Sequence, residues 1–347
     1  MQPFLVLLFL FLIAVRGKTG NLRQRKDSQR VRVFLFNIEY GAEAYDLQSI
    51  VDQISETNSD VVIINEHLRS NGSDASIDIA SRLQWYHTAA PYAAGAVISR
   101  WPVQTDSAFS EAHANYKHED WIKLGGWLSL VKVGGDQNAE ESAFRGPPRF
   151  YIFVIHLNDV PYQPYQAMGF AYDPCTTSNT ALSVNINNID CHHKISDAND
   201  LVNSAWHARG NVINLVLEQS KALAKRKENF IIAGDFNEPS DLDWTSRAVK
   251  AGLVPLRAKF KVSKWLRSAG MRDAYRAVHR DEVAEPGYTW YDPTTSDPTK
   301  GRADRIDFIY VQDVSSVKVR SCDVRSRGHT LSDHLPVQAL VEFDATS

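Results

Sequence analysis

The feature that most constrains this chain is a series of short apolar runs, each followed by a polar or charged residue. The first run, Val31–Phe36, leads to Asn37, and the second, Val61–Ile64, leads to Asn65 and Glu66. Runs of this length, rich in β-branched residues and bounded by glycine, proline or asparagine, are typical of buried strands. The pattern predicts strands at residues 31–37, 60–66, 94–99, 127–133, 150–156, 230–235, 305–311 and 336–343.

Amphipathic stretches at residues 44–58 and 211–227 predict helices between these strands. Alternating strands and helices favour an α/β or α+β sandwich over a helical bundle or an all-β barrel. The chain is 44% hydrophobic and 23% charged, which is ordinary for a globular protein. Residues 159–207, rich in Tyr, Pro, Asn and Asp, are too long for an ordinary connection and predict a functional insertion within a single domain over residues 31–347.

The N-terminus has the character of a targeting segment. Residues Pro3 to Val15 are almost entirely apolar and are followed by Arg16, Gly17 and Lys18. The run is too short to span a bilayer comfortably and predicts a signal peptide over residues 1–17, then a polar segment over 18–30. No Lys or Arg precedes the run, so an uncleaved signal anchor is the alternative. We therefore expect a secreted protein with no membrane span after cleavage, or one tethered by its anchor.

Secretion changes how the cysteines are interpreted. Cys175 and Cys191 lie close together in a polar segment, and in an oxidising compartment we expect them to form a disulfide. The run from Cys191 to His193 could instead bind a metal, although no second cysteine pair lies nearby. Cys322 is expected to be a free, buried thiol. The sequon at Asn71 predicts a glycoprotein.

The charge balance limits the class of partner. The formal net charge is −3, so no global positive field attracts nucleic acid. Non-specific duplex binding, in which phosphate contacts dominate the affinity, is disfavoured. A local basic groove could still bind nucleic acid.

The strongest local motif is the run from Ile231 to Asn237, which includes Gly234 and Asp235. Asp235 and Asn237 are two residues apart and point to the same face of a strand. A carboxylate beside an amide suits a reaction in which a water loses a proton while a neutral donor holds a phosphate oxygen. The alternative is a strand that ends in an ordinary turn.

A second motif places Asp333 directly before His334, ahead of the last strand. Such an acid can orient an imidazole that acts as a base or binds phosphate, although most Asp-His pairs lie in surface loops. Glu66, after a fully apolar strand, could bind a hard cation such as Mg²⁺, which prefers oxygen ligands. Asn37 has an equivalent position at the end of the first strand. Either residue could equally be solvated.

Two further motifs carry polar residues into apolar strands. His156 follows the apolar run that begins at Phe153, where a hydrogen-bonded core histidine is the alternative. Asp304 and Asp307 flank the entrance of a later strand and could serve a site. They could instead form salt bridges with Arg302 and Arg305.

Taken together, the motifs are much more specific than any one of them alone. In chain order they are FNIEYG, VVIINEH, ISRWPV, FVIHLND, IIAGDFNEP, RIDFIYV and SDHLPV. This series resembles the signature of the endonuclease/exonuclease/phosphatase superfamily, from about Val31 to Phe343. The resemblance implies a deoxyribonuclease I-like fold, which is a four-layer α/β sandwich of two mixed sheets flanked by helices, with Mg²⁺ or Mn²⁺ at the strand ends.

The resemblance also implies roles for single residues. Asn37 and Glu66 match the metal-site pair, and His156 matches the phosphate-binding histidine. Asp235 and Asn237 match the catalytic Gly-Asp-x-Asn motif. Asp333 and His334 match the closing Asp-His dyad. Either Asp307 or Asp304 matches a metal-site acid, and Asp307 is preferred. Asn65 departs from the glutamine that often precedes the metal-binding glutamate.

The implied chemistry is in-line attack of water on phosphorus. Asp235 would orient or deprotonate the water, and His334, supported by Asp333, would bind or protonate a phosphate oxygen. We expect a monomeric enzyme acting on a phosphomonoester or phosphodiester of small or medium size, with nucleic acid possible. The alternatives are a deoxyribonuclease I-like endonuclease and a catalytically inactive secreted binding protein.

Overall fold

The computed structural model describes residues 28–89, 95–135, 149–170, 194–291, 303–325 and 331–344. The segment expected to be a signal peptide lies outside the described residues, as does the expected Cys175–Cys191 disulfide. Cys322 is a free thiol and is buried, as expected. Within the described ranges, no helix has both the length and the apolar character needed to cross a bilayer.

Two mixed six-stranded sheets form the centre of the molecule. The first contains, in spatial order, β13 (Val317–Val324), β14 (Val337–Asp344), β1 (Ser28–Asn37), β2 (Val61–Asn65), β4 (Ala96–Ser99) and β3 (Tyr86–Ala89). The second contains β5 (Val103–Thr105), β6 (Gly126–Val133), β7 (Phe150–Leu157), β8 (Phe230–Asp235), β12 (Asp307–Gln312) and β9 (Met271–Asp273). A short ribbon pairs β10 (Trp290–Tyr291) with β11 (Ala303–Asp304).

Side chains alternate between the two faces of each sheet, as the strand period requires. In β1, Val33 and Leu35 enter the core between the sheets, whereas Phe34 and Phe36 face the opposite way. In β8, Ala233 faces the core between the sheets. Three apolar layers therefore alternate with the two sheets, one between them and one on each outer face.

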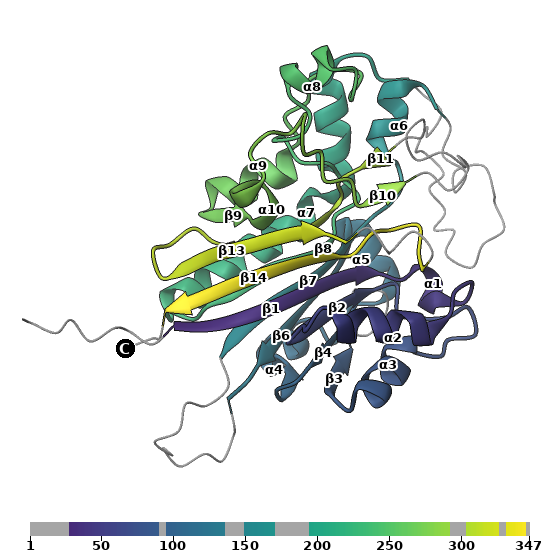
Figure 1. Ribbon diagram of the computed structural model, residues 1–347. Helices are drawn as coiled ribbons and strands as arrows, with labels where there is room; N and C mark the ends of the chain where they lie inside the picture. The colour runs from purple at the N-terminus through teal and green to yellow at the C-terminus, as the bar shows by residue number, and fades with distance from the viewer. Residues whose placement is uncertain are drawn as a thin grey trace, which may run out of the picture.

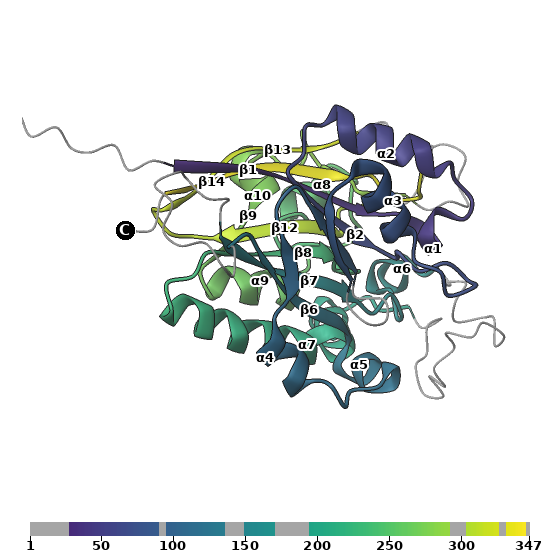
Figure 2. The same ribbon diagram turned by 90° about the horizontal axis from the view of Figure 1, so that it is seen from below.

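Helices cover both outer faces, so the four-layer sandwich expected from the sequence is confirmed (Figure 1). On the first sheet lie α1 (Glu39–Ala42), α2 (Leu47–Glu56) and α3 (Ala75–Leu83). On or beside the second lie α4 (Ser107–Ala112), α5 (His118–Leu124), α6 (Gln163–Met168), α7 (Ala198–Lys225), α8 (Ser246–Lys250), α9 (Lys261–Ser268) and α10 (Ala274–Val278). Figure 2 shows α2 and α7 on opposite sides of the stacked sheets.

The long helix α7 begins at Ala198, well before the expected start at residue 211. Asp197 caps it by accepting hydrogen bonds from the first backbone N–H groups. Gly210, which weakens the helical pattern in the sequence, has a packing role. A Cβ at this position would lie 2.5 Å from the Trp206 ring, so only glycine leaves room for the indole. Residues 194–207 of the expected insertion therefore lead into and form part of a regular helix.

The topology places two parallel strand pairs side by side. β1 is parallel to β2 in the first sheet, and β7 is parallel to β8 in the second. The carboxyl ends of all four strands lie at the same end of the sandwich, because Asn65 of β2 bonds both β7 and β8. Its Nδ2 donates to the Ile155 carbonyl at 3.0 Å, and its Oδ1 accepts the Asp235 N–H at 3.0 Å. In open α/β sheets, sites form beyond the carboxyl ends of strands.

Candidate active site

Four strand ends deliver the central side chains of the candidate site. Asn37 ends β1, Glu66 directly follows β2, His156 lies near the end of β7 and Asp235 ends β8. The close approach of β7 and β8 depends on Gly234. A Cβ there would lie 1.8 Å from the carbonyl oxygen of Ile155, so no other residue fits.

Asn37 joins the two carboxylates of the site. Its Nδ2 donates to Oε1 of Glu66 at 3.0 Å and to Oδ2 of Asp235 at 3.1 Å. The Glu66 side chain is held further by the backbone N–H of Tyr40, which donates to Oε2 at 3.2 Å. Asn37 and Asp235 are both almost fully buried. The carboxylates of two different sheets are thus fixed at a short separation before any ligand binds.

His156 faces the same two carboxylates. Its Nε2 lies 3.7 Å from Oε1 of Glu66 and 3.9 Å from Oδ2 of Asp235. One ligand atom from each of the three residues lies within 4.8 Å of the other two. Trp127 packs against the imidazole, with 5.6 Å between ring centroids. The structure therefore brings together three residues that are far apart in the sequence.

Asp235 also belongs to a second group, with His334 and Asp307. The Nδ1 of His334 bonds Oδ2 of Asp307 at 2.8 Å, and its Nε2 lies 3.7 Å from Oδ2 of Asp235. Burial lowers the pKa of His334, but the carboxylates of Asp307, Asp333 and Asp235 outweigh this effect and raise it well above its ordinary value. The bond to Asp307 holds the imidazole in one orientation, and the raised pKa favours its protonated form.

The pKa of Asp235 moves in the direction expected of a general base. Burial raises it, and the nearby Asp307 carboxylate raises it further, to about 7, although His334 and His156 oppose the shift. A general base works best when its pKa lies near the working pH. Asp235 can therefore hold or accept a proton near neutral pH.

Asp333 supports His334 through its charge, but it is not the partner of the Nδ1 atom. Asp307 bonds the Nδ1 atom, whereas Oδ1 of Asp333 lies 4.0 Å from Nε2. Instead, Asp333 accepts a hydrogen bond from Nε1 of Trp290 at 2.9 Å. Asp333 and His334 are adjacent in the chain, so their side chains point apart. Asp307 reaches His334 because β12 pairs with β8 and Asp307 lies directly opposite Asp235. Asp307 is therefore a positioning residue for His334 in addition to its expected place in the site.

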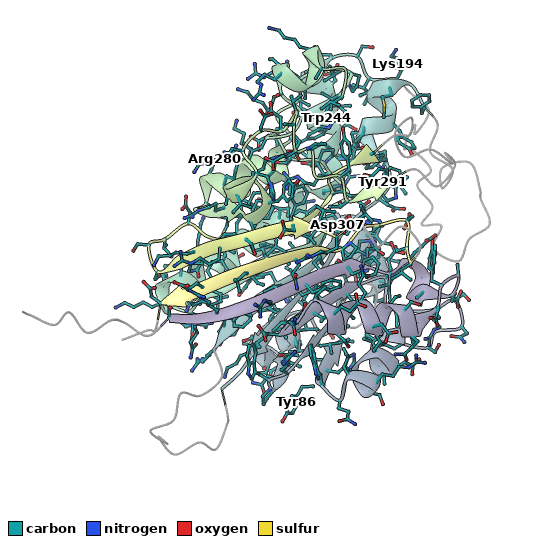
Figure 3. All side chains as sticks on the ribbon, viewed as in Figure 1. Tyr86, Lys194, Trp244, Arg280, Tyr291 and Asp307 are labelled. Carbon is teal, nitrogen blue, oxygen red and sulfur yellow. The ribbon has the colours of Figure 1, made fainter. Side chains whose placement is uncertain are left out.

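Asp304 lies outside both groups. Its Oδ2 accepts a hydrogen bond from the Tyr162 hydroxyl at 2.7 Å, and Trp244 also bonds the side chain. Asp304 was an alternative to Asp307 as a metal-site acid, and the geometry selects Asp307. Figure 3 shows Asp307 near the middle of the molecule, at the end of the sheets, with Tyr291 close by.

Asn237 lies beside Asp235 as the motif predicts. Its backbone has a φ of +46° and its N–H donates to Oδ1 of Asp235 at 2.9 Å. Its Nδ2 donates to the carbonyl of Leu157 at 3.0 Å, which ties β8 to β7 beyond their last paired residues. One donor of the amide is therefore used to position the strand ends.

Sequence reasoning missed three residues of this region. Asp159, three positions after His156, interacts electrostatically with that histidine and with Glu66. Glu39 and Tyr40 follow Asn37 closely and also lie beside the site. All three lie within motifs that the sequence analysis already identified. Their closeness in the chain to Asn37 or His156 was the signal that could have placed them at the site.

The donor set fits a hard divalent cation. Carboxylate oxygens of Glu66, Asp235 and Asp307 converge with imidazole nitrogens, and Oδ1 of Asp307 is buried without a hydrogen-bond partner among the described residues. In the part of the chain that the structure describes, no Lys or Arg forms an ion pair with Glu66, Asp235 or Asp307. The site thus has an excess of negative charge that a metal ion would neutralise.

Comparisons with known proteins bear on the family and the fold. The model of the Endonuclease/Exonuclease/phosphatase family matches residues 34–334. An uncharacterized protein of Caenorhabditis elegans is 35% identical over 85 residues, which cover 23% of this chain and only 26% of that relative.

Solved structures with the same fold include the 3′ phosphatase NExo from Neisseria bound to product DNA hairpin. It is 15% identical, with a TM-score of 0.52, and the match covers 91% of this chain and 100% of that one. An AP endonuclease from Archaeoglobus fulgidus is 16% identical with a TM-score of 0.52, again over 91% and 100%. At such identities the likeness concerns the fold.

Proposed function

Because the chain belongs to the endonuclease/exonuclease/phosphatase family, whose members hydrolyse phosphoester bonds, we propose that it is a metal-dependent phosphoesterase that uses Mg²⁺ or Mn²⁺. One observation carries the proposal. Asp235 is shared by two groups, one with Glu66 and His156 and the other with Asp307 and His334. A structural ion pair would be balanced in charge, whereas these groups contain more carboxylates than cations.

The roles follow from the positions of the side chains. Glu66, Asn37 and the carboxylates beside them would hold the ion, which supplies charge neutralisation at the phosphate when bound. Asp235, with its pKa near 7, accepts the proton of the attacking water. His334, kept cationic by Asp307, binds a phosphate oxygen where negative charge develops.

For the substrate we propose a phosphomonoester or phosphodiester of small or medium size. Residues 159–207, which follow His156, contain one Lys and no Arg, and a groove that follows a polyanion needs several such residues. The nuclease alternative is kept because one relative of the same fold is described with a DNA hairpin and another as an AP endonuclease. An inactive binding protein would have no use for a histidine held between two acids.

One assay separates these alternatives. Purified protein is incubated with a phosphomonoester, a phosphodiester or duplex DNA, each with Mg²⁺, with Mn²⁺ or with EDTA. We expect turnover of a small ester that depends on the metal and is lost in the Asp235→Ala variant. Cleavage of DNA alone would favour the nuclease, and no turnover of any substrate would leave the binding protein.

We also propose that the protein is secreted. The apolar run from Pro3 to Val15 supports this, and Asn71 lies exposed in a turn, where its Oδ1 accepts the Ser73 N–H at 2.8 Å. An exposed loop is where a glycosylated sequon belongs. Expression in secretory cells should yield protein in the medium with a new N-terminus near residue 18 and a glycan removed by Asn71→Gln. Retention in the membrane fraction would favour the uncleaved anchor.

A further inference from the structure

The short element α1 (Glu39–Ala42), which follows Asn37, is interrupted by non-helical residues and forms a kinked loop with an unusual backbone. Glu39, Tyr40 and Ala42 have φ values of +48°, +45° and +58°, in the left-handed region that residues other than glycine rarely adopt. Such strain persists only where the surroundings impose it, and it is concentrated at functional sites. The conformation here directs backbone N–H groups at the site.

Contacts from several directions impose this conformation. The Glu39 N–H donates to Oδ1 of Asn37 at 3.0 Å, the Tyr40 N–H to Oε2 of Glu66 at 3.2 Å, and the Gly41 N–H to the Glu66 carbonyl at 2.7 Å. The Tyr45 hydroxyl holds the Glu39 side chain at 2.6 Å. The loop is therefore held by hydrogen bonds to Asn37 and Glu66, the two expected metal-site residues.

The side chain of Tyr40 has no comparable structural task. It is 56% exposed, and its hydroxyl has no hydrogen-bond partner within the described chain. A left-handed position that served only the backbone would be filled at lower cost by glycine or asparagine. A large ring at this position, half-exposed beside Glu66, is therefore available to a ligand.

The surroundings of the ring indicate the kind of ligand. The carboxylates of Glu66, Asp159, Glu39 and Asp333 interact electrostatically with the phenol, so the half-exposed ring lies in a polar, acidic setting. A lipid tail needs a contiguous apolar patch, and carboxylates surround this ring instead. A planar, polar aromatic group stacks on a tyrosine in such a wet setting.

We propose that Tyr40 determines specificity by stacking on a nucleobase carried by the substrate beside the phosphate. This inference rests on the proposed function and narrows its substrate class to nucleoside phosphates or nucleic-acid ends. The loop presents the ring at a fixed position relative to Glu66, so the base and the phosphate are bound together.

The test compares two ligands that differ only in the base. Adenosine 5′-monophosphate and ribose 5-phosphate are titrated into the Mg²⁺-loaded protein by calorimetry. We expect wild type to bind the nucleotide about 5- to 150-fold more tightly, the range for stacking one base on an aromatic side chain. Tyr40→Ala should remove this preference and leave the affinity for ribose 5-phosphate within about twofold.

Two matched variants sharpen the result. Tyr40→Phe keeps the ring and should keep the preference. Tyr86→Ala removes a tyrosine of similar exposure, 54%, on the edge strand β3, far from Asp307 in Figure 3, and should change neither affinity.

The inference is overturned if wild type does not prefer the nucleotide, if Tyr40→Ala weakens both ligands equally, or if Tyr40→Phe behaves like Tyr40→Ala. Binding needs no turnover, so a preference that depends on Tyr40 without hydrolysis would refute the proposed function alone.

Discussion

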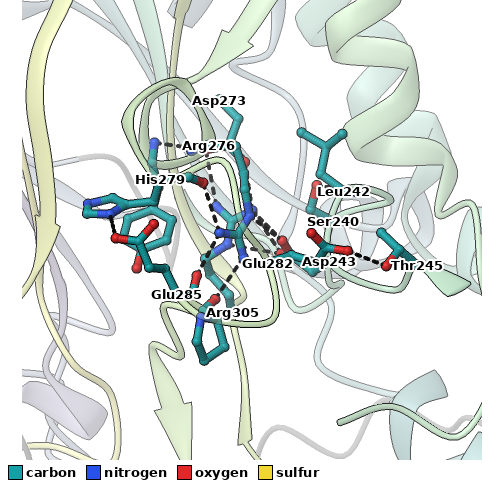
Figure 4. Close-up of polar contacts among 12 residues, drawn as sticks. Ser240, Leu242, Asp243, Thr245, Asp273, Arg276, His279, Glu282, Glu285 and Arg305 are labelled. Carbon is teal, nitrogen blue, oxygen red and sulfur yellow. Dashed lines mark hydrogen bonds and ion pairs between the residues drawn. The ribbon is translucent and has the colours of Figure 1, made fainter. Parts of the chain in front are cut away.

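Two buried polar clusters flank β12, and they differ in charge balance. Arg305 bonds Asp273 and Asp243 with distances of 2.8–3.1 Å, and Arg276 bonds Asp243 at 2.7 Å. Arg276 also donates to the carbonyls of His279, Glu285 and Pro286 (Figure 4). Two guanidinium groups thus face two carboxylates, and their donors are used within the protein.

The other cluster, two residues further along the chain at Asp307, is not balanced in this way. Glu66, Asp235 and Asp307 face two histidines, and one carboxylate oxygen of Asp307 has no partner among the described residues. The balanced cluster fixes the loops around β9 and α10, whereas the unbalanced one can accept a cation and a phosphate. Burial alone therefore does not distinguish structural from functional acids, but charge balance does.

Replacing an aspartate by asparagine should lower kcat in the unbalanced cluster and the free energy of unfolding in the balanced one. The larger effect is the one on kcat. Asp235→Asn removes the proton acceptor, so kcat should fall about 10²- to 10⁴-fold. It also removes a buried charge beside Asp307, so the free energy of unfolding should not fall. Steady-state kinetics and urea denaturation on one preparation measure both. Turnover close to that of wild type would show that Asp235 is not the base.

Asp243→Asn is the matched change in the balanced cluster. It leaves Arg305 and Arg276 buried with one fewer counter-charge, and breaking a buried pair costs about 3–5 kcal/mol. Because Asp243 does not contact the candidate site, kcat of the folded variant should stay near the wild-type value. Urea denaturation gives the loss of stability, and active-site titration corrects the rate for unfolded protein. A large fall in kcat with no loss of stability would contradict the division into two clusters.

Mg²⁺ should stabilise only the unbalanced cluster. An ion that binds the folded protein alone adds about 2.7 kcal/mol when its concentration is 100 times Kd. We expect this gain in wild type and in Asp243→Asn, and its loss or reduction in Glu66→Gln, which weakens a metal ligand. Thermal denaturation over a range of Mg²⁺ concentrations measures the effect. Equal stabilisation of Glu66→Gln and wild type would place the ion elsewhere.

The sequence predicted most of the parts but not their orientation. The strand ends at Asn37, Glu66, His156 and Asp235 were predictable because apolar runs followed by a polar residue mark where strands leave the core. The partner of His334 was not, because adjacency to Asp333 says nothing about which side chain reaches Nδ1. That choice depends on the pairing of β12 with β8, a contact between residues far apart in the chain.

The edges of the fold were also hard to predict. β13 was missed because its pattern is only partly buried, with Arg320 and Ser321 exposed, so it lacks a continuous apolar run. Arg305 was considered as part of a salt-bridged strand entrance, but its partners Asp243 and Asp273 lie in other segments, and no local pattern marks them. Periodicity predicts elements, whereas the balance of buried charge appears only when the elements are packed together.

The smallest expected effect concerns Asp304, which belongs to neither group of the candidate site. Burial raises its pKa to about 7, against the hydrogen bonds from Tyr162 and Trp244. The unfolded carboxyl titrates near 3.9. Between about pH 4 and 7 the folded state therefore binds more protons, and stability must fall as pH rises and then level off.

Asp304→Asn removes this titration. The stability of the variant relative to wild type should therefore improve by at least about 1.4 kcal/mol, the value of one pKa unit, between pH 5 and 8. Since Asp304 does not contact Asp235 or His334, kcat should change less than about threefold, compared with the 10²- to 10⁴-fold scale of a lost proton acceptor. Urea denaturation at several pH values and kinetics at pH 7.5 test both parts, and a fall in kcat as large as that expected of Asp235→Asn would return Asp304 to the site.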